Sequence, residues 1–146
     1  MFKTILVPVD GSEASQRALE KAVELQKNLK SELIILTVYR HQSLLEGSLS
    51  MLKVDDPQNI IDEVQLEHAK KVAETAKALA IEKGSADPHA FVKRGPPART
   101  IVAFGEEHDA ELIVLGARGT GDIERFLLGS VSHKVTGLAD CAVMVV

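Results

Sequence analysis

Short runs of aliphatic and β-branched residues alternate with longer segments of helical period along the whole chain. Such alternation is typical of parallel strands joined by crossover helices, because each buried strand needs a covering layer and a return path. With right-handed crossovers, it predicts an α/β fold, in which one doubly wound, five-stranded parallel sheet carries helices on both faces. The predicted strands are Thr4 to Val9, Leu33 to Val38, Ala90 to Val92, Leu112 to Leu115 and Ala142 to Val146.

Helical periodicity and its end signals place the crossovers between these strands. Ser12 is a credible N-cap for the first helix, and Lys83-Gly84 is a typical end for the second. Between Arg40 and about Asn59 the periodicity lapses, which predicts a long irregular connection with room for a helical turn. The helical segments are an apolar stripe from Ala14 to Leu29, a second from Ala69 to Ala80, a helix that starts at Pro97, and Gly129 to Leu138.

Length and composition limit the classes of protein to consider. With 146 residues, 45% of them hydrophobic and 26% charged, the chain is expected to form one globular domain over residues 1–146. A formal net charge of −4 gives no electrostatic reason to bind nucleic acid or an anionic membrane. No signal peptide or membrane span is predicted, and the single Cys141 cannot form an internal disulfide. We therefore expect a cytoplasmic protein without membrane insertion.

Glycine, serine and aspartate gather where the predicted strands end. In open α/β sheets, ligands bind beyond the carboxyl ends of the strands, where loops meet helix N-termini. We therefore expect three segments to meet at one edge of the sheet. They are Pro8-Val9-Asp10-Gly11-Ser12 after the first strand, Gly116 to Gly121 after the fourth, and Gly129-Ser130-Val131-Ser132 at the following helix.

These residue types suit a nucleotide. Glycines let the backbone approach a phosphate, and a helix start offers free N–H groups and, from Ser130 and Ser132, hydroxyls. Arg118 would add a positive charge, and Asp10 can accept hydrogen bonds from ribose hydroxyls. The main chain around Val38, at the end of the second strand, would receive a base.

The glycine spacing matches a known nucleotide-binding pattern. Two residues separate Gly116 from Gly119, and nine separate Gly119 from Gly129-Ser130, which is the pattern G-2x-G-9x-G-(S/T). With the opening Ile5 to Ser12 and the closing apolar strand, the chain resembles ATP-binding universal stress proteins over its whole length. The resemblance implies an adenine nucleotide alpha hydrolase-like fold.

The resemblance also implies roles for individual residues. Val9 and Asp10, which follow Pro8, would lie against adenine and ribose, and the backbone of Val38 would hold adenine. The ribose and phosphates would be held by Leu115, Gly116, Gly119, Gly129, Ser130, Val131 and Ser132. The resemblance further implies a homodimer through the last strand, a role in stress survival, and a regulated protein partner such as a transporter.

Simpler interpretations stand beside these. A single glycine pair is more often a turn, and Asp10-Gly11-Ser12 is equally well a turn followed by a helix cap. The chain lacks the lysine of a P-loop and the early glycines of a dinucleotide fingerprint. Its five histidines show no paired ligand spacing, so we expect no metal held by protein side chains. Cys141 is expected to be a packing residue rather than a redox centre.

The predicted site favours binding over turnover. Phosphoryl transfer needs dense positive charge and a group that orients the nucleophile, whereas this site offers Arg118 and no obvious base. We expect a homodimeric ATP-binding regulator in which Mg²⁺ arrives with the phosphates. Two alternatives remain, a slow ATP hydrolase or autophosphorylating protein and a scaffold that does not depend on nucleotide. Independently of the resemblance, an apolar last strand at a sheet edge favours pairing with a second copy.

Overall fold

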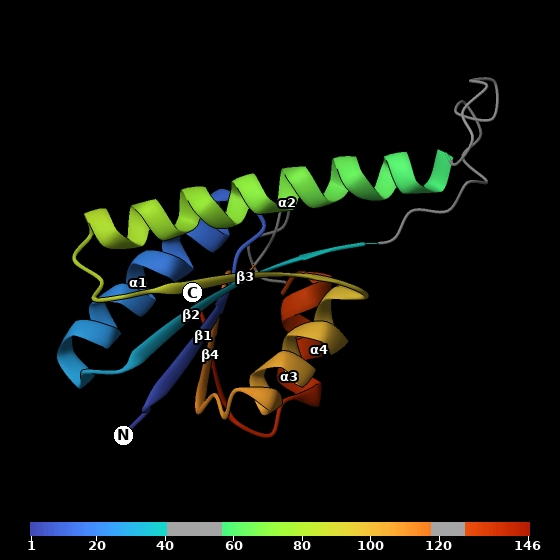
Figure 1. The fold of residues 1–146 in the computed structure, drawn as a ribbon. Coiled ribbons are helices and arrows are strands. Elements are labelled where there is room, and N and C mark those ends of the chain that lie inside the picture. Colours follow the sequence, from blue (N-terminus) through green and yellow to red (C-terminus); the bar gives the residue numbers. More distant parts are fainter. Residues whose placement is uncertain (41–56, 118–127) are drawn as a thin grey trace.

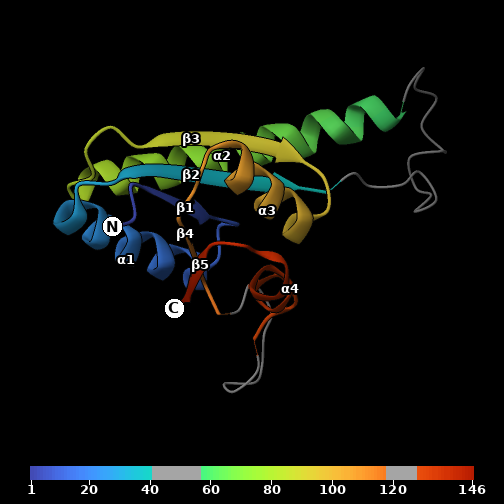
Figure 2. The same cartoon turned by 90° about the horizontal axis from the view of Figure 1, so that it is seen from below.

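The protein forms one five-stranded parallel sheet in the spatial order β3-β2-β1-β4-β5 (Figures 1 and 2). The computed structural model describes residues 1–40, 57–117 and 128–146. All four strand pairs are parallel, as the alternating sequence pattern predicted. The strands are β1 (Thr4–Pro8), β2 (Glu32–Tyr39), β3 (His89–Arg94), β4 (Leu112–Leu115) and β5 (Ala142–Val145).

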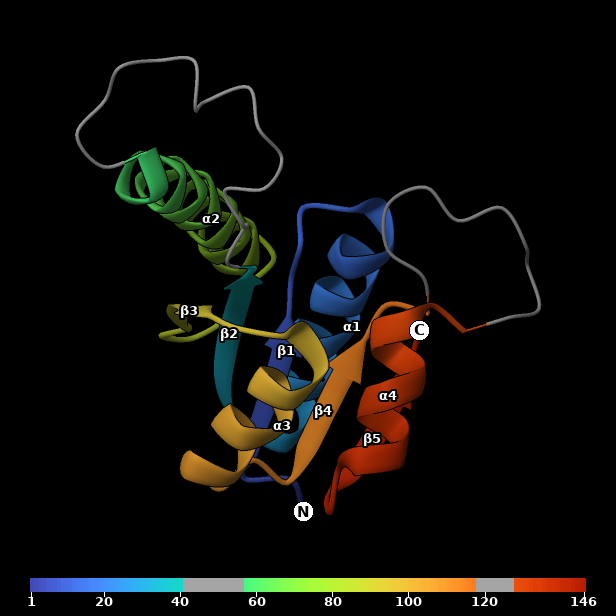
Figure 3. The same ribbon diagram turned by 90° about the vertical axis from the view of Figure 1, so that its right-hand side faces the viewer.

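Helices cover both faces of the sheet, which confirms the predicted fold class (Figure 3). α1 and α2 pack on one face, and α3 and α4 pack on the other. Each helix lies between consecutive strands in the chain. Their bounds are α1 (Glu13–Leu29), α2 (Pro57–Glu82), α3 (Pro97–Glu107) and α4 (Ser130–Leu138).

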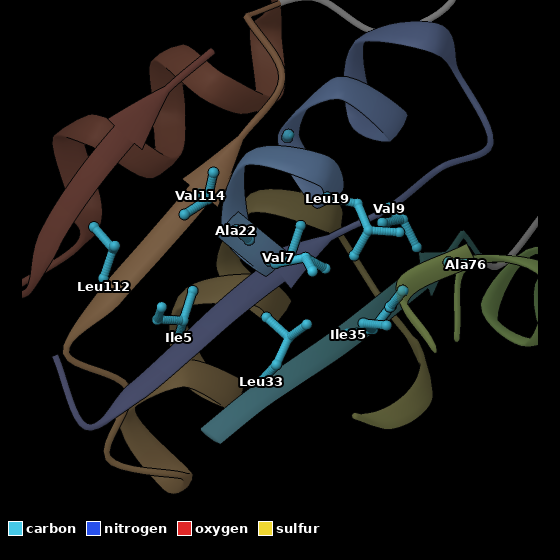
Figure 4. Packing of buried hydrophobic residues seen from close by; sticks show 13 residues of the cluster. Ile5, Val7, Val9, Leu19, Ala22, Leu33, Ile35, Ala76, Leu112 and Val114 are labelled. Carbon is cyan, nitrogen blue, oxygen red and sulfur yellow. The ribbon is translucent and has the colours of Figure 1, made fainter. Parts of the chain in front are cut away.

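The central strand β1 supplies side chains to two separate cores. Ile5 and Val7 point toward α1 and α2 (Figure 4), whereas Leu6 points toward α3 and α4. All three are fully buried. A strand covered on both faces is apolar at most of its positions, which explains the continuous run Ile5-Leu6-Val7.

The local signals at the helix ends are largely confirmed. The Ser12 hydroxyl accepts a hydrogen bond from the backbone N–H of Ser15, so Ser12 caps α1 as predicted. α2 ends at Glu82, and Gly84 follows with a positive φ of 99°. Its start differs from the prediction, because the helix begins at Pro57, inside the expected irregular connection. Proline lacks an N–H and suits the first helical turn, where that donor would have no partner. The remainder of the predicted connection, residues 41–56, lies outside the described residues.

β3 is longer than the predicted Ala90 to Val92. It runs from His89 to Arg94 because it pairs with β2 along its whole length, ending with Tyr39 beside Arg94. Most residues of β3 are exposed, and the residues at its two ends are polar. The hydrophobic pattern of the sequence therefore does not reveal its full length. None of the helices in the described part of the chain is long and apolar enough to cross a membrane.

Cys141 lies just before β5 and packs against the core beneath α3 and α4. Burial raises the pKa of its thiol, and the neighbouring carboxylates of Asp140 and Glu106 act in the same direction. Because the thiolate is the reactive form, the folded environment lowers the reactivity of this cysteine near neutral pH.

We predict that iodoacetamide modifies Cys141 more slowly in the folded protein than in the urea-unfolded chain at neutral pH. The difference should narrow as the pH rises through the elevated pKa, because the folded thiol then ionises as well. A time course of intact mass measures both rates. Equal rates in the two states at neutral pH would contradict the assigned environment.

Candidate functional site

The strand order places a crevice at the carboxyl ends of β1 and β4. From β1 the chain continues to β2 and β3 on one side, whereas β4 and β5 lie on the other. The helix after β1 covers one face of the sheet, and the helix after β4 covers the opposite face. The two connections therefore diverge, and open α/β sheets bind ligands at such a switch point.

A cavity of about 440 Å³ lies at this point. Every predicted site residue within the described ranges lines it, and Arg118 and Gly119 lie outside those ranges. The cavity brings together three strand ends, the start of α1 and the start of α4. Its predicted lining residues are Pro8, Val9, Asp10, Val38, Leu115, Gly116, Gly129, Ser130, Val131 and Ser132.

A compact hydrogen-bonded turn forms the wall at the end of β1. Asp10 Oδ1 accepts from the Ser12 N–H at 2.9 Å, and Ser12 Oγ accepts from the Ser15 N–H at 3.2 Å. Ser15 Oγ in turn accepts from the Asp10 N–H at 3.3 Å. Gly11 occupies the turn with a φ of 86°, a conformation that favours glycine. The carboxylate of Asp10 is thus held in place beside the cavity.

The peptide groups of Val38 face the cavity side of β2. The Leu36 carbonyl accepts from the Val9 N–H on the β1 side, whereas the Tyr39 carbonyl accepts from the Gly95 N–H on the β3 side. Peptide groups alternate in direction along a parallel strand, so those of Val38 face the same side as those of Leu36. Pairing with β1 stops at Pro8 and Leu36. The N–H and C=O of Val38 therefore lie just beyond the ladder, where a planar ligand can use them.

The first turn of α4 presents backbone donors. Gly129 is the N-cap residue and provides no side-chain cap, and the first bond within the helix joins the His133 N–H to the Gly129 carbonyl. The N–H groups of Ser130, Val131 and Ser132 precede that bond and have no partner within the helix. Together with the helix dipole, these donors favour an anion.

The Ser132 hydroxyl has a different task from the one expected. The sequence suggested that it would bind phosphate, but its side chain is buried and donates to the Ala117 carbonyl at 2.8 Å. The same carbonyl accepts from the Gly129 N–H at 2.6 Å. Ser132 therefore ties α4 to the end of β4, and Ser130 keeps the exposed hydroxyl at this helix start.

Sequence reasoning missed the apolar wall of the cavity. Leu36, Pro97 and Ile101 line it, and Ser12 and Ser15 complete the lining beside Asp10. A sequence signal was available for Pro97 and Ile101. They lie in the first turns of the helix that follows β3, and such a helix begins at the carboxyl edge of the sheet. Asp10 is the one charged side chain among the lining residues that the structure describes.

Gly116 has a packing role as well as its place at the cavity. A Cβ atom at this position would lie 2.7 Å from the carbonyl carbon and 2.9 Å from the Cβ of Ala14, in the first turn of α1. Backbone atoms at such a distance cannot move aside locally. The end of β4 and the start of α1 approach this closely only because residue 116 has no side chain.

We predict that Gly116→Ala lowers the free energy of unfolding by roughly 1–3 kcal/mol, as for other overpacked sites. Gly137→Ala is the matched control, because a Cβ there meets nothing within 4 Å and the residue lies inside α4. The free energy of unfolding of that control should rise by roughly 0.5–1 kcal/mol, because alanine has a better helix propensity than glycine. Urea unfolding of both variants measures the difference, and equal effects would contradict the contact.

Comparison with known proteins agrees with the sequence resemblance. The model of the Universal stress protein family matches residues 1–146. A universal stress protein of Bacillus subtilis (strain 168), YxiE, is 40% identical over 149 aligned residues that cover 100% of this chain and 99% of the relative.

Solved structures show the same fold. The universal stress protein UspA from Lactobacillus plantarum superposes with a TM-score of 0.83 at 27% identity, covering 99% of this chain and 97% of the other. A universal stress protein in complex with cAMP gives a TM-score of 0.71 at 26% identity, covering 99% and 96% of the two chains. This chain therefore belongs to the universal stress protein family.

Proposed function

We propose that the protein is an ATP-binding, homodimeric regulator of the cytoplasmic stress response, whose nucleotide state changes the surface it presents to a protein partner. The observation that carries the proposal is the cavity at the β1–β4 switch point, where an apolar wall meets uncapped backbone donors. Its volume of about 440 Å³ falls within the range typical of small-molecule sites. A structural relative bound to cAMP supports a nucleotide as the ligand class.

The lining residues divide into three parts that match the parts of ATP. Val9 and Ile101 offer apolar contacts to adenine, and the free peptide groups of Val38 can exchange hydrogen bonds with its edge. Asp10 would accept from a ribose hydroxyl. The phosphates would lie against the first turn of α4, with Gly119 and Arg118 assigned to them from the sequence pattern alone.

The phosphate subsite depends on the backbone for its positive potential. Among the described lining residues there is no cation, so the N–H groups of Ser130, Val131 and Ser132 provide the attraction. Mg²⁺, when bound with ATP, would neutralise phosphate charge and be held mainly by phosphate oxygens. Regulation then follows from population shift, in which ATP favours the arrangement that binds it better.

We predict that Ser130→Glu weakens Mg-ATP binding by about tenfold or more, because a carboxylate would face the phosphates at the start of α4. The fold should not suffer, since an acidic residue at a helix N-terminus interacts favourably with the helix dipole. Ser130→Gln is the matched neutral control and should bind within a few-fold of the wild type. Calorimetry with Mg-ATP and with adenosine separates the charge effect from general damage to the site.

Adenosine carries no phosphate and should bind both variants alike. Loss of adenosine binding together with ATP would place the nucleotide elsewhere or point to a distorted cavity. Absence of Mg-ATP binding to the wild type at millimolar concentration would end the proposal. Mass spectrometry of small molecules that remain with the purified protein gives an independent identification.

The two sheet edges differ in a way that supports the proposed dimer. β3 forms one edge and carries the exposed charges of Lys93 and Arg94. β5 forms the other edge with the sequence AVMV, and its last three residues are only partly buried. Charged edges resist pairing, whereas an exposed apolar edge can pair with a second strand.

The hydrogen bonds of Val146 show which N–H groups of β5 point outward. Its N–H donates to Leu115 and its carbonyl accepts from Ala117, so Val146 faces β4 and Val145 faces away from the sheet. We predict that Val145→Pro, which removes an outward donor, yields a monomer. Val145→Ala retains the donor and should remain a dimer. Sedimentation equilibrium at micromolar concentration measures both masses, and a monomeric wild type would refute the edge assignment.

A further inference from the structure

A second cavity lies on the opposite side of the β1–α1 turn from the proposed nucleotide site. It has a volume of about 320 Å³ and opens between α1 and α2. Val9, Ser12 and Ser15 line both cavities and form the wall between them. The other residues around the second cavity come from the β1–α1 connection, α1 and α2. They are Gly11, Gln16, Leu19, His68, Lys71, Val72, Thr75, Ala76 and Leu79.

The floor of this second cavity is apolar and belongs to the core. Val9, Leu19 and Ala76 are buried members of the cluster beneath α1 and α2, and Val72 and Leu79 pack against it while partly exposed. A Cβ on Gly11 would lie 3.7 Å from Val72, an ordinary van der Waals contact, so the backbone of Gly11 and the Val72 side chain border the cavity about one methyl group apart. The cavity is therefore a pit in the core surface with a mouth toward solvent.

The mouth is basic in an acidic protein. His68 and Lys71 are one helical turn apart on α2, and both are exposed. No aspartate or glutamate appears among the described lining residues, although the chain has a net charge of −4. Within the described residues neither His68 nor Lys71 makes an ion pair, whereas the adjacent Lys70 pairs with Glu67 at 3.5 Å. A cationic group beside an apolar pit matches a ligand with one anionic end.

The size of the cavity limits the apolar part of that ligand. Its volume equals that of about ten water molecules in the liquid state, so the cavity admits on the order of ten non-hydrogen atoms. A short aliphatic or aryl chain can enter it and bury its surface against Leu19, Val72 and Leu79.

We infer that the crevice between α1 and α2 is a second ligand site, which binds a small amphipathic carboxylate. The carboxylate lies at Lys71 and His68, and the apolar body of the ligand occupies the pit behind them. This site goes beyond the proposed ATP cavity and does not depend on nucleotide binding there.

The test uses three probes of equal chain length and different charge: octanoate, 1-octanol and octylammonium. Backbone amide shifts in NMR titrations of the full chain report both affinity and location. Octanoate should bind best, and the largest shifts should come from Gly11, Gln16, Val72 and Ala76. Equal affinity for all three probes, or shifts centred elsewhere, would overturn the inference.

Two charge variants test the mouth without touching the core. Lys71→Gln should lower octanoate affinity by about two- to fivefold, the effect expected for a partly exposed ion pair, and leave 1-octanol unchanged. Gln16→Glu places a carboxylate on the α1 side and should reverse the preference in favour of octylammonium. Lys77→Gln is the matched control, because Lys77 is exposed on the same helix and lies outside the residues that line this cavity. An equal effect of Lys71→Gln and Lys77→Gln would refute the assignment of the mouth.

A third variant tests the pit itself. Thr75 is exposed at its rim, and Thr75→Trp should fill the mouth and abolish octanoate shifts while the thermal unfolding midpoint stays near that of the wild type. If the crevice instead holds a second copy of the chain, octanoate will fail to bind the wild type. The same Thr75→Trp change will then lower the sedimentation mass. That result would replace the ligand site with an interface.

Discussion

The close approach between Gly116 and the first turn of α1 sets the geometry on which the candidate site depends. With a side chain at residue 116, the end of β4 would be pushed away from Ala14, to which its Cβ would lie 2.9 Å. Gly116 also lines the cavity, together with Asp10 and Ser12 from the β1–α1 connection. A glycine that the nucleotide pattern assigns to phosphate approach is therefore also required by the fold itself. Packing against the start of α1 is thus one physical cause for a glycine at this position, independent of any ligand.

The sequence predicted the fold well where hydrophobic pattern and end signals agreed. β4 was placed at its true bounds, and Ser12 was recognised as a cap, because both are decided by neighbouring residues. β3 and the start of α2 were predicted less well, since pairing with β2 extends β3 into polar residues and Pro57 lies in a segment without periodicity. Local pattern carries no information about such long-range pairing.

The candidate site was likewise predictable from the sequence only in part. Strand-end residues such as Pro8 and Val38 were predicted because the carboxyl edge of a parallel sheet is where ligands bind. The task of the Ser132 hydroxyl was not predictable, because its partner is the Ala117 carbonyl, fifteen positions earlier in the chain. Hydroxyl side chains at a helix start can turn to the ligand or back to the protein, and only the tertiary arrangement decides between the two. In this chain the buried Ser132 supports the end of β4 and leaves the backbone N–H groups as donors for the proposed anion.

The wall made by Val9, Ser12 and Ser15 has a hollow on each side, and its two serines are joined by the capping bonds of α1. Such a partition is stiff, because moving one serine breaks a bond to the other. If ligands occupy both proposed sites, one that displaces this wall would enlarge its own compartment and narrow the other. Thermodynamic reciprocity then requires each occupant to alter the affinity of the other by the same factor. The proposed nucleotide site and the proposed carboxylate site therefore share a single turn of backbone as their common wall.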